Sequence, residues 1–248
     1  MKAHDSLTSR VGAGAALAGG AALCAYLLPA IAGLSTDEGA PVLPWVRHAL
    51  GVEDHTCSGR GYALTFDDGP HPEGTPAVLA ILAQARVRAT FFLVGEQVRR
   101  SPSLVAEILA CGHEIGLHCD RHRNLARLTP WQVRADIERA RETIGAAGGR
   151  EVGLYRPPYG VLNAAALSIA RARGWRTLLW SRWGRDWTPA ATPASIAARV
   201  SAHAREGEVL LLHDADDYSA PGSWRKTARA LPRVLEAMSA AGIQAADL

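Results

Sequence analysis

Residues 62–70 read Tyr-Ala-Leu-Thr-Phe-Asp-Asp-Gly-Pro, an apolar run that ends in two adjacent carboxylates and a turn. The run predicts a buried strand over residues 62–66, and the Gly-Pro pair predicts a turn directly after it. Similar short apolar runs recur along the chain at 89–94, 113–117, 153–155, 176–180 and 208–212. Helical patterns separate these runs. The alternation predicts an α/β domain with a parallel sheet, either open or closed into a barrel.

Capping residues mark the starts of several predicted helices. Thr75 followed by Pro76 predicts an N-cap, and Thr129 with Gln132 has the spacing of a capping box. Further helices are predicted over residues 163–173, 193–204 (with Thr192 as its cap) and 224–240.

Length and composition limit the class of protein. The chain has 248 residues, of which 48% are hydrophobic and 21% charged, so disorder is a poor description. A net charge of +3 is too weak and too dispersed to indicate a nucleic-acid partner. Composition leaves the oligomeric state open. The 4 cysteines form neither a disulfide framework nor a CxxC zinc site.

The N-terminus carries the pattern of an export signal. Lys2 and Arg10 precede residues 11–34, which hold no ionisable side chain except Cys24 and Tyr26. Residues 1–34 are therefore predicted to be a signal peptide or a retained membrane anchor, with a buried Ala-rich helix as the alternative. Residues 35–58 are predicted to be a linker, and residues 59–248 the functional domain. We expect an extracytoplasmic protein, secreted or anchored, that meets the membrane only through residues 11–34 if they are retained.

Export from the cytoplasm would affect whether the cysteine thiols pair or stay free. Outside the cytoplasm a Cys57–Cys111 bridge is possible, and a buried free thiol is the alternative for each of Cys57, Cys111 and Cys119.

Two adjacent carboxylates follow the first strand. Asp67 and Asp68 cannot both be buried without a cation, because like charges destabilise each other in a low dielectric. A metal bound by one carboxylate would leave the other as a base. The alternative is a solvated Asp-Asp-Gly-Pro turn.

Two histidines follow the third predicted strand. His118 and His122 are four residues apart, so one helical turn would place both imidazoles on the same side. Two nitrogen ligands and one carboxylate suit a divalent metal, zinc first and cobalt or another first-row ion second. Two surface histidines are the alternative interpretation.

Polar residues also follow the later strands. Arg156 precedes a rigid Pro-Pro turn that contains Tyr159, where an arginine can pair with a carboxylate and a backbone N–H can be aimed into a site. A plain loop is the alternative. His213 ends the strand at 208–212, and with Asp186 as hydrogen-bond partner it would be a held imidazolium able to protonate a leaving group. Trp187 and Leu211 can form an apolar wall for a small acyl methyl group.

Together these segments resemble the NodB-homology polysaccharide deacetylases of carbohydrate esterase family 4. The resemblance covers about residues 61–242 and is carried, in order, by TFDDGP, GHEIGLHxxxH, RPPYG, DW and LLLH. It implies a distorted (β/α) barrel with fewer than eight strands. It also implies removal of acetyl groups from N-acetylhexosamine polymers or acetylated xylan.

The resemblance assigns base, ligand, orienting and substrate-contacting roles to matching residues. These are Asp67 as base; Asp68, His118 and His122 as metal ligands; Arg156 as the arginine that orients the base; the Tyr159 backbone N–H as oxyanion donor; Asp186 as partner of the general acid His213; and Trp187 and Leu211 as the acetate pocket.

Some positions depart from the family pattern. Leu117 stands where Asn is frequent, Cys119 where Ser or Thr is frequent, and Trp183 where many relatives carry an acidic residue. Trp183 and the acidic loop with Asp214, Asp216 and Asp217 are expected to alter the substrate groove.

We therefore expect a metal-dependent hydrolase that removes acetyl groups from N-acetylated amino sugars of a polysaccharide, of the chitin-oligomer or peptidoglycan type. An O-acetyl esterase on xylan-like polymers is the alternative, and an inactive glycan-binding protein is a third.

Overall fold

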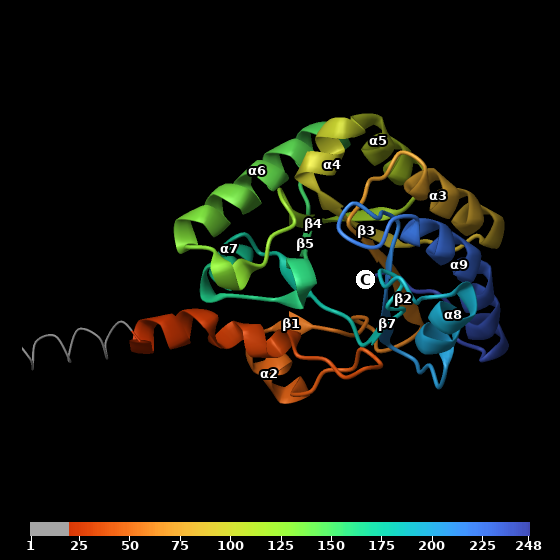
Figure 1. Cartoon of the computed structure of the whole chain (residues 1–248), viewed down its shortest axis with the longest axis horizontal. Helices are drawn as coiled ribbons and strands as arrows, with labels where there is room; N and C mark the ends of the chain where they lie inside the picture. Colours follow the sequence, from red (N-terminus) through yellow and green to blue (C-terminus); the bar gives the residue numbers. More distant parts are fainter. Residues whose placement is uncertain (1–19) are drawn as a thin grey trace, which may run out of the picture.

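Eight parallel strands form one curved sheet in the computed structural model, which describes residues 20–248 (Figure 1). The strand order is β1-β6-β5-β4-β3-β2-β8-β7. The strands are β1 (Val52–Glu53), β2 (Tyr62–Asp67), β3 (Thr90–Val94), β4 (Glu114–Cys119), β5 (Leu154–Tyr155), β6 (Arg176–Leu178), β7 (Arg182–Trp183) and β8 (Glu208–His213). The predicted α/β class is confirmed.

The strand count differs from the expected number of fewer than eight. β1 and β7, which the sequence did not predict, contain two residues each, too few for hydrophobic alternation to reveal them. Among the described residues β1 and β7 do not pair with each other, so the sheet is open between its two edge strands.

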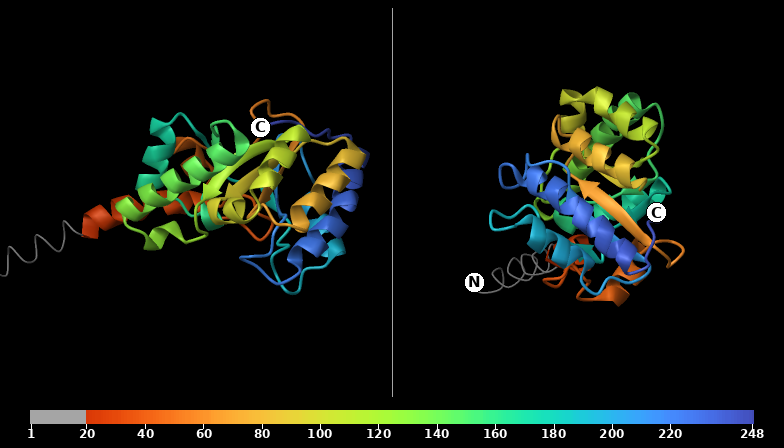
Figure 2. Two further views of the ribbon diagram at one scale, coloured as in Figure 1. Left: turned by 90° about the horizontal axis from the view of Figure 1, so that it is seen from above. Right: turned by 90° about the vertical axis from the view of Figure 1, so that its right-hand side faces the viewer.

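The helices cover the outer side of the sheet, as the views in Figure 2 show. They are α2 (Pro44–Ala49), α3 (Gly74–Ala85), α4 (Gly95–Arg100), α5 (Pro102–Ala110), α6 (Pro130–Gly148), α7 (Ala164–Ala172), α8 (Pro193–Ser201) and α9 (Ser223–Ala240), with short 3-10 helices η1 (Leu28–Gly33), η2 (Leu125–Arg127) and η3 (Pro158–Gly160). The core lies between the helices and the sheet and includes the stacked rings of Phe66 and Phe91.

The capping predictions hold for two helices and fail for one. Capping boxes at Thr129 and Thr192 open α6 and α8. Thr75, the predicted N-cap of α3, lies inside that helix instead. Its buried hydroxyl accepts a hydrogen bond from the His71 N–H and donates one to Asp214, so a tertiary contact replaces the cap.

Residues 35–58, the predicted linker, are packed into the domain. They contribute β1 to the sheet, and Arg47 of α2 is buried, where it donates to the carbonyl oxygens of Ala32 and Trp180 and to Asp54. At the other edge the Glu38 carbonyl accepts a hydrogen bond from the Trp183 N–H of β7. This segment therefore occupies the gap between the edge strands. Its contacts depend on distant residues, which a local pattern does not show.

The N-terminal prediction falls partly outside the described residues, which begin at Gly20. Residues 20–27 are helical and lead into η1. Over residues 20–248, no helix combines the length and the apolar character needed to cross a bilayer. Cys57 and Cys111 are free and exposed, so the possible bridge between them is not formed, and Cys119 is the buried free thiol.

The register of the sheet assembles the polar residues. Asp67 pairs with His213 where β2 and β8 end, and Leu117 of β4 pairs with Tyr155 of β5. The second pairing places Arg156 next to His118. Because parallel strands end at the same edge of a sheet, residues separated by up to 146 positions meet at its carboxyl ends.

Candidate active site

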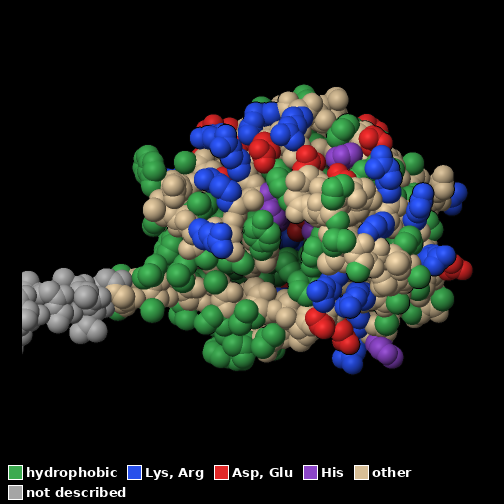
Figure 3. Space-filling model, in the orientation of Figure 1, with side chains coloured by type: hydrophobic (Ala, Val, Ile, Leu, Met, Phe, Trp, Pro, Cys, Tyr) green, Lys and Arg blue, Asp and Glu red, His purple; other side chains and the backbone are tan. Residues whose placement is uncertain are grey.

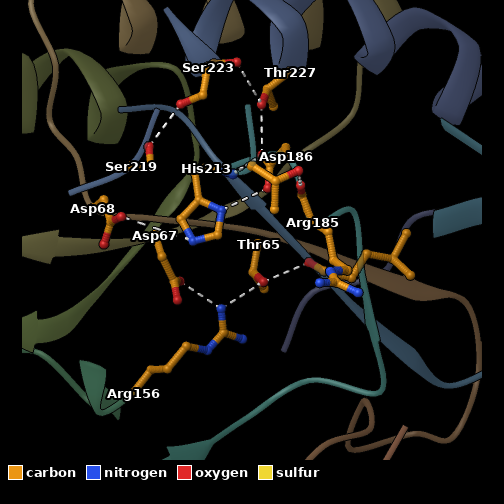
Figure 4. A network of polar contacts seen from close by, with 12 residues as sticks. Thr65, Asp67, Asp68, Arg156, Arg185, Asp186, His213, Ser219, Ser223 and Thr227 are labelled. Carbon is orange, nitrogen blue, oxygen red and sulfur yellow. Dashed lines mark hydrogen bonds and ion pairs between the residues drawn. The ribbon is translucent and has the colours of Figure 1, made fainter. Parts of the chain in front are cut away.

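A pocket of about 200 Å³ opens at the carboxyl ends of the strands. It is visible as the hollow at the centre of the face in Figure 3. Eight of the ten residues expected to form the site line it: Asp67, Asp68, His118, His122, Tyr159, Trp187, Leu211 and His213. The other two, Arg156 and Asp186, are buried behind the lining and hold Asp67 and His213 (Figure 4).

A change of backbone direction brings both carboxylates into this pocket. Successive residues of a strand point to opposite faces, but Asp68 follows β2 with a φ of 80° and lines the same pocket as Asp67. Gly69 completes the turn, and a Cβ there would lie 2.5 Å from the Asp214 carboxylate. The turn is therefore a packed element rather than a solvated loop.

Asp68, His118 and His122 converge on one point. Asp68 Oδ1 lies 3.5 Å from His118 Nε2 and 3.3 Å from His122 Nε2. Ligands about 2.0–2.2 Å from a tetrahedral ion are about 3.3–3.6 Å apart, so the spacing fits a metal site. Asp68 Oδ1 is buried and has no hydrogen-bond partner, which leaves it free to bind a cation. The sequence predicted that one helical turn would hold both histidines. Instead, His118 is the second-last residue of β4, and His122 lies in the loop that follows this strand.

Contacts with neighbouring residues hold the imidazole rings of His118 and His122 in orientations that suit metal ligands. His118 Nδ1 donates to the Arg156 carbonyl oxygen at 2.7 Å, so its Nε2 lone pair faces Asp68. The ring of His122 lies between Tyr159 and Tyr218, with centroids 4.5 and 4.6 Å away. Burial lowers the pKa of both imidazoles to about 3 and raises the pKa of Asp68 to about 7. Without a cation the protein thus favours neutral forms in this place, and a cation would restore the carboxylate.

Asp67 is held by a buried arginine. Arg156 Nη1 lies 2.7 Å from Asp67 Oδ1, and the guanidinium is fully buried. The same guanidinium donates to the Thr65 hydroxyl and to the carbonyl oxygens of Leu178 and Leu179, so its position is fixed from β2 and from the end of β6. Asp67 is not one of the three grouped ligands, and its geometry suits a base next to the metal site.

His213, the strand-register partner of Asp67, is held by Asp186. Asp186 accepts hydrogen bonds from His213 Nδ1 at 2.9 Å, from the His213 backbone N–H at 2.7 Å and from the Thr227 hydroxyl at 2.6 Å (Figure 4). Burial alone would lower the pKa of His213, but the adjacent Asp186 carboxylate outweighs burial and raises it to about 10. The ring is thus an imidazolium near neutral pH, as a proton donor requires.

The apolar wall forms as predicted. Trp187 stands edge-on to the His213 ring, with centroids 5.3 Å apart, and Leu211 lines the same pocket. Tyr159, the expected oxyanion donor, has a φ of 59° between Pro158 and Gly160 and lies at the pocket. The direction of its backbone N–H as a donor stays a prediction.

The three acidic side chains of the loop after β8, which were expected to alter the substrate groove, do not line the pocket. Asp214 is buried against α3, and Asp217 pairs with Arg100. Asp216 binds the Gly222 N–H and faces His71, whose Nδ1 accepts from two N–H groups at the start of α3. Although His71, Asp216 and Asp217 lie close enough to hold an ion, these bonds assign them to loop and helix structure.

Aromatic residues that the sequence did not single out complete the lining. Tyr218 stacks on His122, and its hydroxyl donates to Glu96 and accepts from Gln97 of α4. Trp180 lies beside Trp183, with ring centroids 5.8 Å apart, and both line the pocket. Tyr218 belongs to an irregular loop, so only its aromatic character five residues after His213 could have pointed to it.

Comparisons with known proteins agree with this arrangement. The polysaccharide deacetylase family model matches residues 55–178. A peptidoglycan-N-acetylglucosamine deacetylase of Bacillus cereus is 40% identical over 154 residues, which cover 61% of this chain and 71% of that protein. A chitooligosaccharide deacetylase of a Bradyrhizobium species is 34% identical over 195 residues, which cover 75% of this chain and 87% of that protein.

A solved structure extends the similarity to the fold. It is a peptidoglycan N-acetylglucosamine deacetylase in complex with a naphthyl-substituted N-oxidanyl-benzamide. It superposes with a TM-score of 0.76 at 30% identity and covers 84% of this chain and 95% of its own. By sequence and by fold, the chain belongs to the NodB-homology polysaccharide deacetylases of carbohydrate esterase family 4.

Proposed function

We propose that this chain is a metal-dependent hydrolase that removes acetyl groups from N-acetylated amino sugars of a polysaccharide. The observation that carries the proposal is that three groups of side chains lie together in one pocket. The same pocket is lined by a three-residue ligand group, an arginine-held carboxylate and an aspartate-held imidazole. The relatives named above act on peptidoglycan N-acetylglucosamine and on chitooligosaccharides, which supports an N-acetylglucosamine unit as the reacting sugar.

Asp68, His118 and His122 are the residues that would hold the metal. Two imidazoles and one carboxylate favour zinc, with cobalt or another first-row ion as a functional substitute. A divalent cation bound there would supply Lewis-acid chemistry, polarising a carbonyl and acidifying a water molecule.

The side chains around the ligands divide the remaining work. Asp67, held and oriented by Arg156, accepts the proton of the attacking water. Trp187 and Leu211 contact the acetyl methyl group, and the Tyr159 N–H donates to the carbonyl oxygen as negative charge develops. His213, charged and positioned by Asp186, donates its proton to the departing nitrogen, so that an amine leaves rather than an amide anion.

Acetate release across a panel of glycans tests the function. We expect release from chitooligosaccharides and from peptidoglycan fragments, and its loss with a chelator. Release from acetylxylan alone would favour the O-acetyl esterase. No release from any glycan, together with retained glycan binding, would favour an inactive binding protein.

His213→Ala separates amide from ester hydrolysis. We expect deacetylation of an N-acetylated chitooligosaccharide to fall by about 10²–10⁴-fold, because the amine cannot leave without a proton. Hydrolysis of an aryl acetate should fall much less, because its oxygen leaves unprotonated. Initial rates on both substrates with the same enzyme preparation measure the ratio. An equal fall on both would mean that His213 is not the acid for the leaving group.

We further propose that the domain lies outside the cytoplasm, beside a membrane. Among residues 20–248, five of the seven exposed large hydrophobic side chains fall between residues 23 and 45: Leu23, Leu28, Leu34, Val42 and Trp45. The Val42 N–H donates to the Leu34 carbonyl oxygen, so the two residues are neighbours. In Figure 3 hydrophobic side chains gather over the N-terminal helix and α2. None of the five lines the active-site pocket.

Contact of Trp45 with lipid tests this location. The full chain in liposomes that contain brominated phosphatidylcholine should lose part of its tryptophan fluorescence, since Trp45 is 67% exposed on an apolar surface. Trp45→Phe should remove most of that quenching. Trp131→Phe is the matched control, because Trp131 is 78% exposed on α6, and quenching should persist there. Equal quenching in both variants would contradict the proposed surface.

A further inference from the structure

A second hollow adjoins the active site and shares Tyr159 with it. Its lining is Arg123, Asn124, Arg127, Leu128 and Tyr159, around a volume of about 450 Å³. Tyr159 packs edge-to-face against the metal-ligand candidate His122 and lines both spaces. A polymeric substrate whose reacting unit lies over His122 would extend past Tyr159 into this hollow.

Arg127 is the unpartnered charge of this hollow. Its side chain makes no hydrogen bond or ion pair with any residue of 20–248, and it is exposed at the end of η2. Arg123 differs, because it pairs with the buried Asp136 at 2.7 Å. The guanidinium of Arg127 is therefore available to a ligand, while that of Arg123 is engaged by the protein.

The surroundings of Arg127 favour an anion. Lys and Arg side chains gather over the α6 side of the central hollow in Figure 3. The acids closest in sequence, Asp120 and Asp136, are buried and each bind arginines, so neither neutralises Arg127.

We propose that Arg127 binds a carboxylate on the sugar next to the reacting N-acetylglucosamine, so that the enzyme prefers an acidic glycan of the peptidoglycan type to neutral chitooligosaccharides. This inference rests on the proposed function and specifies its substrate class. In peptidoglycan each N-acetylglucosamine is flanked by N-acetylmuramic acid, which bears a lactyl carboxyl or a peptide with carboxylates. Chitin carries none of these groups. A guanidinium recognises a carboxylate through paired, charge-assisted hydrogen bonds.

Two tetrasaccharides test the proposal. One is N-acetylchitotetraose, and the other alternates N-acetylglucosamine with N-acetylmuramic acid. For Arg127→Gln we expect kcat/KM on the acidic tetrasaccharide to fall about tenfold, mostly through KM, because the hydrogen bonds to a charged group are lost. On chitotetraose kcat/KM should stay unchanged. Salt should weaken the wild-type preference and have little effect on that of the variant.

Arg134→Gln is the matched control. Arg134 is also exposed and unpaired among the described residues, but it lies on α6 and lines neither hollow. It should leave both rates unchanged. Equal losses on both substrates in Arg127→Gln, or no loss on either, would overturn the carboxylate site while leaving the deacetylase activity established. Absence of acetate release from both substrates in the wild-type enzyme would instead refute the proposed function.

Discussion

Asp67→Asn is expected to lower kcat/KM for acetate release by about 10²–10⁴-fold while the bound metal stays at the wild-type level. An amide cannot accept the proton of the attacking water. The metal content should persist because Asp68, His118 and His122 form the ligand group without Asp67. Acetate release and metal analysis on the same preparation measure both quantities.

The buried arginine makes a folding control necessary. Removing one partner of a buried ion pair costs about 3–5 kcal/mol of unfolding free energy. Arg156 would retain its bonds to Thr65, Leu178 and Leu179, so we expect a folded but less stable variant. Asp54→Asn is the matched control, since it removes the carboxylate partner of buried Arg47 outside the site. A folded Asp67→Asn enzyme with normal turnover would contradict the role of Asp67 as base.

The sequence predicted where the longer strands end, but it did not predict the short strands at the two edges of the sheet. The longer strands of the sheet were predicted because apolar runs there precede polar residues, and these strands carry Asp67, His118 and His213. β1 and β7 escaped prediction because two residues give no period. Arg47 shows why the segment before β2 was misjudged as a linker. Its buried bonds join residues far apart, including the Trp180 carbonyl 133 positions away.

The site was predicted by residue type more accurately than by local geometry. His118 and His122 were expected on one helical turn, but the end of a strand and the following turn bring their Nε2 atoms together. The supporting hydroxyl of Thr227 could not be predicted, because it reaches Asp186 from α9, 41 positions away. Tyr218 was missed for a similar reason. Its position on His122 depends on hydrogen bonds between its hydroxyl group and the side chains of Glu96 and Gln97 in α4.

Loss of the metal is expected to eliminate activity as completely as loss of the base. Prolonged dialysis against a chelator should lower the rate more than about 10³-fold, since Lewis-acid stabilisation contributes several kcal/mol to the transition state. Zinc or cobalt added afterwards should restore the rate. One metal ion per chain is expected, because the other group with ligand spacing among residues 20–248, at His71, is already engaged in hydrogen bonds.

Two histidine variants locate the ion. His118→Ala should reduce both the metal content and the rate to near zero, because it removes a ligand whose Nε2 lies 3.5 Å from Asp68. His71→Ala should keep one metal ion per chain and at least most of the rate, since His71 caps α3 and does not line the active-site pocket. Circular dichroism of both variants verifies folding. Retention of the ion in folded His118→Ala, or its loss only in His71→Ala, would move the metal away from Asp68 and remove the basis of the proposed chemistry.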